Sequence, residues 1–372
     1  MARGDRRLLI VSLDRLAVAG LQRMVIDLGR CLAQRGWKTR ILFPDSSGEA
    51  LLADWTAEAE PAEIVITDAI KHSSLPRSRQ DVLRFEREIV RFNPSVVNLH
   101  SGVNYCSVKD VASVVLARKR PVVTIHAPHA ERGAAQTRAV RLAAPFVKAF
   151  VANSAATAEG IAATGIRRSK IHTVNCGVRP TLAFGRPRAR NLLGIPESAF
   201  VISAVGGLVA YKGFVELAEV VAHLNATGSE TFLLIAGDGP EAEAVARAAQ
   251  KLGNHCRMLG RVKDTTPVFA AADLFVLPSR EEGFGLVYLE AAFQGVPSIG
   301  YRSGGAPDAI GDESTGLLVQ PGDTVGLTEA IRALRADPQR RTRMGANAKA
   351  RASASFTDEV MATGYEQILD RT

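Results

Sequence analysis

Short, almost continuously apolar segments recur along this chain, and segments with a helical spacing of apolar residues separate them. The apolar segments occupy residues 7–13, 38–43, 95–100, 121–126 and 149–154, and then residues 199–207, 231–239, 255–260, 273–279 and 296–301. Between the first two, residues 21–35 place Met24, Val25, Leu28 and Leu32 on one helical face. Apolar strands that alternate with helices predict an α/β fold whose parallel sheets are covered by helices on both faces.

The alternation lapses once, in the Gly-, Pro- and Arg-rich segment 176–198. We interpret this segment as a linker between two Rossmann-like domains in tandem, which occupy residues 1–180 and 181–355. Residues 324–372 have a helical, charged pattern that Pro338 interrupts, and we expect 356–372 to form a helix that packs back on the first domain. A central cleft between the two sheets is the expected site, because open α/β sheets bind ligands at the carboxyl ends of their strands.

Composition limits where such a protein works. Of the 372 residues, 47% are hydrophobic and 23% are charged, which is ordinary for a globular protein. No apolar run approaches the roughly 18 to 20 residues of a membrane-spanning helix, and Asp14 interrupts the basic start where a signal peptide would be apolar. We therefore expect a cytoplasmic protein. No C-x-x-C pair is present, so we expect buried reduced thiols rather than zinc ligands or disulfides at Cys31, Cys106, Cys176 and Cys256.

Positive charge is concentrated in the first half of the chain. Residues 1–200 contain 30 Lys and Arg against 17 Asp and Glu, whereas residues 201–372 contain 16 against 21. A basic half would attract phosphate-bearing substrates, anionic lipid or nucleic acid. Because the sequence has no RNA-recognition, helix-turn-helix or zinc-finger signature, nucleic acid is not an expected partner.

A basic amphipathic segment lies between residues 132 and 150. On a helical wheel, one arc is basic (Arg138, Arg141, Lys148) and another is apolar (Ala139, Val140, Leu142, Phe146, Val147), although Pro145 must end or kink the helix. Such a segment is either an ordinary helix with a solvated face, which the low aromatic content favours, or a peripheral contact with the inner face of an anionic membrane.

The stretch SREEGFGLVYLEAAFQG (279–295) carries the strongest chemical signal. It is a turn between a predicted strand and a short helix that ends at Gly295, so backbone N–H groups at the start of the helix would bind phosphate. Gly283 and Gly285 let a ligand approach the backbone, and the carboxylates of Glu282 and Glu290 can accept hydrogen bonds from sugar hydroxyls. Taken alone, two glutamates near a helix start are more often helix-capping and dipole partners than functional residues.

Further motifs give the stretch a specific resemblance. PSREEGFGLVYLEAAFQGVPSIGYRSGGAPDAI (278–310) is accompanied, in order, by VGGLVAYKG (205–213), AGDGP (236–240), LGRV (259–262) and GLLVQPGD (316–323). This set resembles the group 1 (family four) retaining glycosyltransferases of the GT-B fold. The resemblance covers nearly the whole chain and is strongest after residue 200.

The resemblance implies a metal-independent hexosyltransferase that uses no cofactor. Its donor would be a nucleotide-diphosphate sugar, UDP- or GDP-linked, bound by the second domain. The first domain would bind a glycan, a lipid-linked molecule or a small molecule as acceptor. A phosphate oxygen of the donor would take the proton of the acceptor hydroxyl. The alternative is a non-catalytic GT-B accessory protein that binds a sugar nucleotide or glycan. A Rossmann dehydrogenase is disfavoured because no G-x-G-x-x-G follows the first strand.

The resemblance also implies residue roles. Glu282, Lys212 and His126 would be catalytic: Glu282 would hold donor-sugar hydroxyls, Lys212 would neutralise the diphosphate, and His126 would face the transferred sugar. Glu290 would bind the ribose. The remaining donor contacts would be Gly20, Gly206, Gly207, Arg261, Val262, Gly283, Phe284, Gly285 and Leu286. His100 and Ser154 also end predicted strands, but a lone histidine there is more often structural.

The sequence departs from the family pattern at several places. Gly207 stands where the family usually has an arginine that pairs with the diphosphate, and one charged hydrogen bond to phosphate is worth about 1.5 to 3 kcal/mol. Ala19 and Gln22 replace a usual glycine and glutamate, and NCGVRP (175–180) replaces the usual N-G-V-D. Because of these differences, the sequence does not identify the donor or the acceptor. It does not indicate the oligomeric state either.

Overall fold

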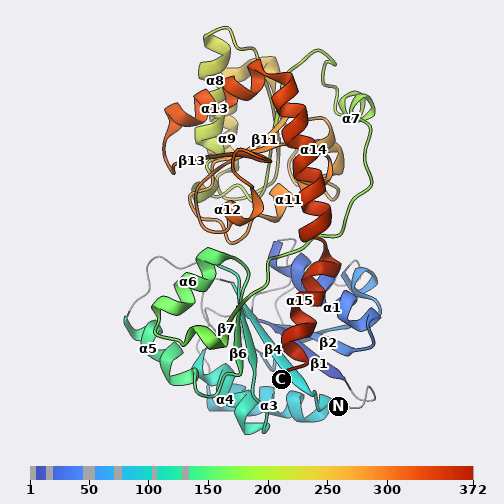
Figure 1. The fold of residues 1–372 in the computed structure, drawn as a ribbon, viewed down its shortest axis with the longest axis vertical. Helices are drawn as coiled ribbons and strands as arrows, with labels where there is room; N and C mark the ends of the chain where they lie inside the picture. The colour runs from blue at the N-terminus through green and yellow to red at the C-terminus, as the bar shows by residue number, and fades with distance from the viewer. Residues whose placement is uncertain are drawn as a thin grey trace. The chain divides into compact units, whose positions relative to one another are not determined.

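The chain divides into two units, and one parallel sheet lies at the centre of each (Figure 1). The structure, a computed structural model, describes residues 6–13, 20–44, 55–70, 78–102, 107–127 and 134–371, without the side chains of residues 134–136 and 139. Met1–Arg179 together with Asp358–Thr372 form unit 1, and Pro180–Thr357 form unit 2. The predicted α/β architecture with two parallel sheets is confirmed.

The described residues of unit 1 contain a sheet of seven strands. In sheet order these are β3 (Glu63–Thr67), β2 (Lys38–Pro44), β1 (Arg7–Ser12), β4 (Val96–Ser101), β5 (Val122–Ile125), β6 (Ala149–Ala152) and β7 (Ile171–Thr173). The unit's helices are α1 (Gly20–Gln34), α3 (Arg79–Phe92), α4 (Val108–Leu116), α5 (Ala134–Ala143), α6 (Ala155–Ala163) and α15 (Asp358–Leu369), with a 3-10 turn η1 (Arg168–Lys170). Side chains of β1 and β4 are almost all buried because helices cover the sheet.

Local sequence explains how helices of this unit begin. Before α3, Ser78 Oγ accepts a hydrogen bond from the Asp81 backbone N–H (3.1 Å), and the Asp81 carboxylate accepts one from the Ser78 N–H (2.8 Å). Ser107 and Asp110 form the same reciprocal capping box before α4. Apolar side chains of these helices, such as Phe85 and Val114, pack in the core beneath the sheet. The caps thus set where each helix starts, and the apolar side chains set which face it buries.

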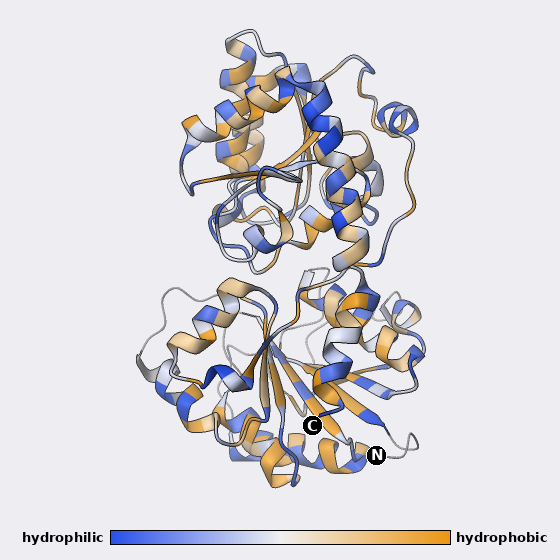
Figure 2. Ribbon diagram, in the orientation of Figure 1, coloured by the Kyte–Doolittle hydropathy of each residue, from blue (hydrophilic) through white to orange (hydrophobic). Residues whose placement is uncertain are grey.

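Unit 2 has a sheet of six strands in the described part of the chain. In sheet order these are β10 (Cys256–Met258), β9 (Phe232–Ala236), β8 (Val201–Val205), β11 (Leu274–Leu277), β12 (Ser298–Tyr301) and β13 (Gly316–Val319). The helices are α7 (Arg186–Leu192), α8 (Phe214–Ala226), α9 (Ala242–Ala249), α10 (Thr266–Ala270), α11 (Leu286–Phe293), α12 (Ala306–Ala309), α13 (Thr324–Ala336) and α14 (Pro338–Ser355), with 3-10 turns η2 (Ala210–Lys212) and η3 (Gln250–His255). Figure 2 shows hydrophobic residues concentrated in the strands of both units.

The linker prediction for 176–198 is wrong for residues 186–192, which form α7. Pro187 lies in the first turn, where a proline is tolerated because its missing N–H would have no partner there. The side chain of Arg190 is buried, and its guanidinium donates to an Asp273 carboxylate oxygen at 2.9 Å and to the Ala271 carbonyl at 3.1 Å. Arg190 of the predicted linker therefore docks α7 against the start of β11.

The amphipathic face predicted around residue 140 is also wrong in part. Helix α5 ends at Ala143, before Pro145. Val140 and Val147 are buried in the core, whereas Leu142 is 64% exposed and Phe146 is 51% exposed. The apolar residues therefore do not share one face, because the chain changes direction after the helix. Strands β3, β7 and β13 were missed because each lies at a sheet edge and is short or only partly buried.

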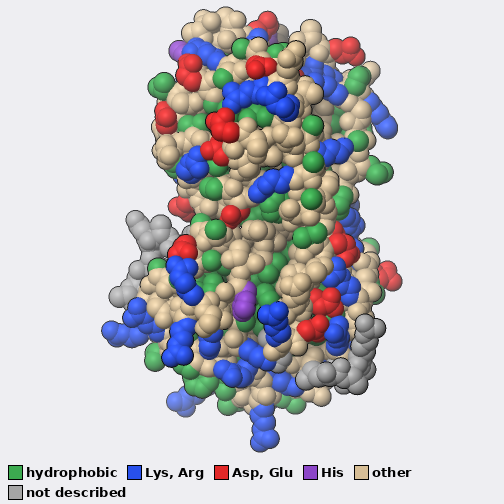
Figure 3. All heavy atoms as spheres, in the orientation of Figure 1, with side chains coloured by type: hydrophobic (Ala, Val, Ile, Leu, Met, Phe, Trp, Pro, Cys, Tyr) green, Lys and Arg blue, Asp and Glu red, His purple; other side chains and the backbone are tan. Residues whose placement is uncertain are grey.

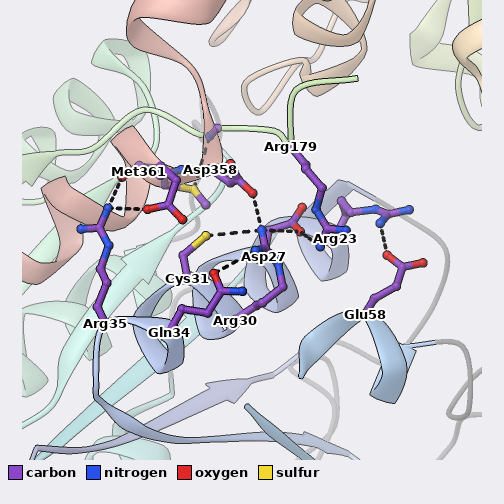
Figure 4. Close-up of polar contacts among 12 residues, drawn as sticks. Arg23, Asp27, Arg30, Cys31, Gln34, Arg35, Glu58, Arg179, Asp358 and Met361 are labelled. Carbon is purple, nitrogen blue, oxygen red and sulfur yellow. Dashed lines mark hydrogen bonds and ion pairs between the residues drawn. The ribbon is translucent and has the colours of Figure 1, made fainter. Parts of the chain in front are cut away.

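The end of the chain is helical, as its pattern predicts. Pro338 begins α14 directly after the Asp337 cap, so the proline separates α13 from α14. Helix α15 belongs to unit 1, where Trp37 Nε1 donates to the Glu366 carboxylate at 3.1 Å. Figure 4 shows further polar contacts between α15 and α1, which involve Arg30 and Asp358. Among the described residues, every helix is too short or too polar to span a lipid bilayer.

Candidate active site

The strand order of unit 2 reverses between β8 and β11. These strands are neighbours, with Leu274 opposite Ile202, although β9 and β10 lie between them in sequence and on the other side of β8 in the sheet. Loops that leave two such strands diverge, and the crevice at their carboxyl ends is the usual ligand position of an open α/β sheet. Lys212 follows β8, and Glu282 follows β11.

Lys212 and Glu282 meet at this point. The Lys212 ammonium donates to Glu282 Oε2 at 2.6 Å, and the side chains are 16% and 8% exposed. The two loops are also joined through the backbone, because the Arg280 N–H donates to the Tyr211 carbonyl at 2.7 Å. Two residues 70 positions apart thus form one partly buried ion pair. It places an ammonium that can bind phosphate beside a carboxylate that can accept hydrogen bonds from hydroxyls.

The turn that carries Glu282 requires glycine. Gly285 has a φ of +90° and caps α11, and a Cβ there would lie 2.4 Å from Tyr288 Cδ2 and 3.2 Å from Glu282 Cγ. Tyr288 is held in place because its hydroxyl donates to the Leu277 carbonyl at 2.9 Å. The aromatic ring, the glycine and the carboxylate therefore form one packed unit at the start of the helix.

The adjacent glycines Gly304 and Gly305 pack against the backbone of Glu282. The Gly305 N–H donates to the Glu282 carbonyl at 2.9 Å, and a Cβ on Gly304 would lie 1.8 Å from that oxygen. Gly304 has a φ of +52°. Sequence reasoning quoted this glycine pair as part of a motif but gave it no role. Its signal was two adjacent glycines directly after a predicted strand, which mark a close approach of two backbones.

Glu290 joins a third loop to the site. Its Oε2 accepts a hydrogen bond from Thr265 Oγ1 at 2.9 Å, and Thr265 caps α10 at the end of the loop that follows β10. The same loop carries Arg261, which is exposed, and Val262, which is half-buried. Loops from β8, β10 and β11 thus bring together most of the residues predicted for the donor.

The other predicted residues differ in their surroundings. Gly207 is exposed and Gly206 half-buried in the loop after β8. Phe284 is buried against Phe356, with ring centroids 5.8 Å apart, so only its backbone is available to a ligand. Gly283 and Leu286 flank it in the same turn. Gly20 and His126 lie in unit 1, where Gly20 is the exposed first residue of α1.

His126 does not stand alone in unit 1. Its Nε2 lies 3.0 Å from Nδ1 of His100, and Nε2 of His100 lies 2.8 Å from Nδ2 of Asn98. Asn98 Oδ1 accepts from Thr124 Oγ1 at 3.0 Å. Sequence reasoning treated His100 as a lone structural residue and missed Asn98. The signal was available in NLH (98–100) and TIH (124–126), because alternate polar residues on two neighbouring strands lie on the same face.

Burial keeps this histidine pair neutral. It lowers the pKa of His126 from its usual 6.5 to about 4, and it lowers the pKa of His100 well below 6.5, an effect to which His126 adds. No carboxylate is among the causes of either shift. The pair is therefore built for hydrogen bonding in the uncharged form.

We expect acid to destabilise the protein through this pair. Between pH 6.5 and about 4 the unfolded chain protonates His126 but the folded chain does not, so the free energy of unfolding falls as the pH falls. His126 alone would contribute about 3 kcal/mol of this loss. Urea unfolding at pH 7 and pH 4.5 would measure this decrease in the free energy of unfolding. The decrease should be smaller in His126→Gln than in the wild type. Equal acid losses in the two proteins would contradict the expectation.

The described cysteines show no disulfide, and Cys31 and Cys176 are buried. Cys256 is only partly buried, so the prediction of four buried thiols is wrong there; Cys106 lies outside the described residues. Burial raises the pKa of Cys256 to about 11, which keeps its thiol protonated. No group of three or more potential metal ligands occurs in the part of the chain that the structure describes.

Two family models match the chain. The model described as glycosyl transferases group 1 matches residues 185–351, and the model described as Glycosyltransferase Family 4 matches residues 18–182. Together the two matches span most of both units.

Curated relatives have glycosyltransferase names. One relative is a GDP-mannose-dependent monoacylated alpha-(1-6)-phosphatidylinositol monomannoside mannosyltransferase of Corynebacterium glutamicum. The two sequences are 34% identical over 199 residues, and the aligned region covers 51% of this chain and 52% of the relative. The chain is also 34% identical over 187 residues to the lipopolysaccharide core biosynthesis glycosyltransferase LpsD of Rhizobium meliloti, and this aligned region covers 50% of this chain and 53% of LpsD. The chain spans about half the length of these relatives.

Solved structures share the fold over the whole chain. Anabaena Alr3699/HepE, solved in complex with UDP, has a TM-score of 0.82 at 21% identity and covers 98% of this chain and 100% of its own. A glycosyltransferase from Rickettsia africae has a TM-score of 0.83 at 18% identity and covers 99% of this chain and 98% of its own. At such identities the likeness establishes the fold alone.

Proposed function

We propose that this chain, which belongs to the group 1 (family four) glycosyltransferases, moves a hexose-type sugar from a nucleotide-diphosphate sugar to an acceptor hydroxyl with retention of anomeric configuration. The observation that carries the proposal is the 2.6 Å pair of Lys212 and Glu282 at the strand-order reversal of unit 2. UDP- and GDP-sugars are the donors that we expect. The relatives' names mention GDP-mannose, phosphatidylinositol mannoside and lipopolysaccharide core, so glycan and lipid-linked acceptors come first.

The pair suits the chemistry of a departing diphosphate. As the bond between the anomeric carbon and the phosphate oxygen breaks, negative charge grows on the diphosphate, and the Lys212 ammonium would stabilise it. Glu282 would then accept hydrogen bonds from sugar hydroxyls in place of Lys212. The acceptor oxygen bonds to the anomeric carbon on the same face, and its proton passes to a phosphate oxygen of the leaving group. No nucleophile of the protein is required for this step.

Donor binding and turnover test the proposal separately. A thermal-shift series with UDP-, GDP-, ADP- and dTDP-sugars should give a rise in Tm with one base, since a ligand stabilises the state that it binds. Release of nucleoside diphosphate in the presence of glycan, lipid-linked and small-molecule acceptors then measures transfer. Binding without turnover across such a panel, unchanged by Glu282→Ala, would favour a non-catalytic sugar-nucleotide-binding protein instead.

Gly207 offers a gain-of-function test. A Cβ at Gly207 would meet no heavy atom within 4 Å, so a side chain can be added without a clash. Arg280, the arginine nearest to Glu282 in sequence, is bound by the Glu216 carboxylate. If the family arginine is missing and not replaced, Gly207→Arg should tighten donor binding by roughly ten- to a hundredfold. Titration calorimetry with the matched Gly207→Ala control would show it, and an equal Kd for both variants would contradict the expectation.

We also propose that the protein works in the cytoplasm, at the inner face of an anionic membrane when its acceptor is lipid-linked. Leu142 and Phe146 are exposed, and Arg138 is exposed on the same α5 segment. Lys and Arg side chains are numerous on the visible face of unit 1 (Figure 3). Co-sedimentation with anionic vesicles should fall several-fold for Leu142→Ser/Phe146→Ser. Equal binding of this variant and wild type, or none by either, would contradict the contact.

A further inference from the structure

Polar side chains of two neighbouring strands form a continuous hydrogen-bonded row inside unit 1. The row runs from Thr124 through Asn98 and His100 to His126, with donor-to-acceptor distances of 3.0, 2.8 and 3.0 Å. All four side chains are buried. The register places His100 opposite Thr124, so β4 and β5 present these residues on one face of the sheet. The geometry of the row is therefore fixed by the sheet.

Each link in the row needs one donor and one acceptor, so the direction of the first link determines the others. Thr124 donates to Asn98 Oδ1, which leaves the Asn98 amide nitrogen to donate to His100 Nε2. A neutral His100 that accepts at Nε2 carries its proton on Nδ1. This Nδ1–H donates to Nε2 of His126, so His126 in turn carries its proton on Nδ1.

Tyr365 of α15 covers the row at His100. Its ring stacks on His100 with centroids 6.1 Å apart, and burial raises the pKa of its hydroxyl, which therefore keeps its proton. In the described part of unit 1 this hydroxyl has no hydrogen-bond partner. The direction of the first link is therefore given by the Asn98 amide, whose Oδ1 faces Thr124 Oγ1 and whose Nδ2 faces His100 Nε2.

We propose that Asn98 and His100 are positioning residues that hold His126 as its Nδ1–H tautomer, so that His126 presents a neutral hydrogen-bond donor to its ligand. The described residues give Nδ1 of His126 no partner, so this N–H is available. The identity of the ligand rests on the proposed function: the N–H would donate to an oxygen of the transferred sugar. A row of opposite direction would present an acceptor there and would select a hydroxyl hydrogen instead.

NMR of the protein labelled with 15N-histidine tests the tautomer directly. Two-bond 1H–15N correlations report which ring nitrogen carries the proton, and His100→Gln and His126→Gln assign the two rings. We expect both rings to be protonated at Nδ1 and bare at Nε2. The control His223→Gln, at an exposed position of unit 2, should leave both signals unchanged. Protonation of both rings at Nε2 would overturn the proposal.

Asn98→Asp tests the positioning role. An aspartate can only accept from His100, so it should draw the proton to Nε2 of His100, reverse the row and move the His126 proton to Nε2. With the fold retained, we expect a roughly tenfold lower kcat, the cost of about one hydrogen bond. If Asn98→Asp does not fold, Thr124→Val serves in its place, because loss of the orienting hydroxyl should give both tautomers.

The outcomes separate this proposal from the proposed function. An unchanged kcat in a variant whose His126 signal has moved to the Nε2–H form would overturn the positioning role. The same holds for a Thr124→Val protein that keeps a single Nδ1–H form. Absence of transfer by the wild type with every donor would instead contradict the proposed function, and the NMR signals would still decide the direction of the row.

Discussion

Lys212→Met is expected to lower kcat by about 10²- to 10³-fold, the usual cost of removing a group that stabilises charge in a transition state. The Lys212 ammonium lies 2.6 Å from Glu282 Oε2 at the switch point of unit 2, where the donor diphosphate is proposed to bind. Methionine keeps the length of the side chain but removes its charge. Donor Kd should weaken less than kcat falls, because the charge on the diphosphate is greatest in the transition state.

The structure supplies controls for this variant. Lys251→Met removes an exposed lysine of the same unit, whose ammonium lies 3.9 Å from Glu219, and should leave kcat unchanged. Because Lys212→Met leaves the buried Glu282 carboxylate without its cation, Lys212→Met/Glu282→Gln separates a folding defect from a chemical one. Thermal unfolding of each variant reports the fold. A kcat within about threefold of the wild type in Lys212→Met would contradict the role.

Arg30→Met is expected to lower the free energy of unfolding by about 3 to 5 kcal/mol, the usual cost of leaving buried charges without their partner. Arg30 on α1 is hydrogen-bonded to Asp358 at the start of α15 and lies 3.6 Å from Asp27 (Figure 4). The side chains of both carboxylates are nearly fully buried. Asp27 has a second cation, Arg179, at 3.3 Å, but burial still raises its pKa, and its Oδ2 has no partner among the described residues.

Urea unfolding by circular dichroism would measure this loss. The matched control is Arg168→Met, which removes an arginine of the same unit that pairs with Glu159 at 2.7 Å but is exposed, and which should leave the unfolding midpoint unchanged. The comparison separates burial from charge pairing. Equal midpoints for Arg30→Met and wild type would show that the α1–α15 pair adds no stability.

Local sequence was sufficient for much of the fold. The apolar segments became β1, β2, β4, β5 and β6 in unit 1 and β8 to β12 in unit 2. Most of these strands are buried on both faces and therefore largely apolar, whereas β10 is a partly exposed edge strand. The turn in SREEGFG was also predicted from its glycines, and the structure gives Gly285 a φ of +90° beside the Tyr288 ring, which glycine allows. The motifs indicated the family because each motif is a short stretch of sequence, and the motifs follow one another in the family's order and spacing.

The candidate site was predictable as a set of residues but not as an arrangement. The family motifs named Lys212 and Glu282 as separate positions. Their direct pairing depends on the strand order, which places β8 beside β11, and no local pattern contains that order. Gly304 gained a role only when its loop met the Glu282 carbonyl.

What the sequence determined by itself was the alternation of strands and helices, the glycine-dependent turns and the family, because these depend on neighbours within a few residues. Only the tertiary structure decided which polar groups meet. It made His100 the partner of His126, made Arg30 the partner of Asp358, which is 328 positions away, and made Arg190 of the predicted linker a buried contact of α7. The physical reason is that a buried polar group must find its partner wherever the packed sheets and helices bring one, and distance along the chain does not limit that choice.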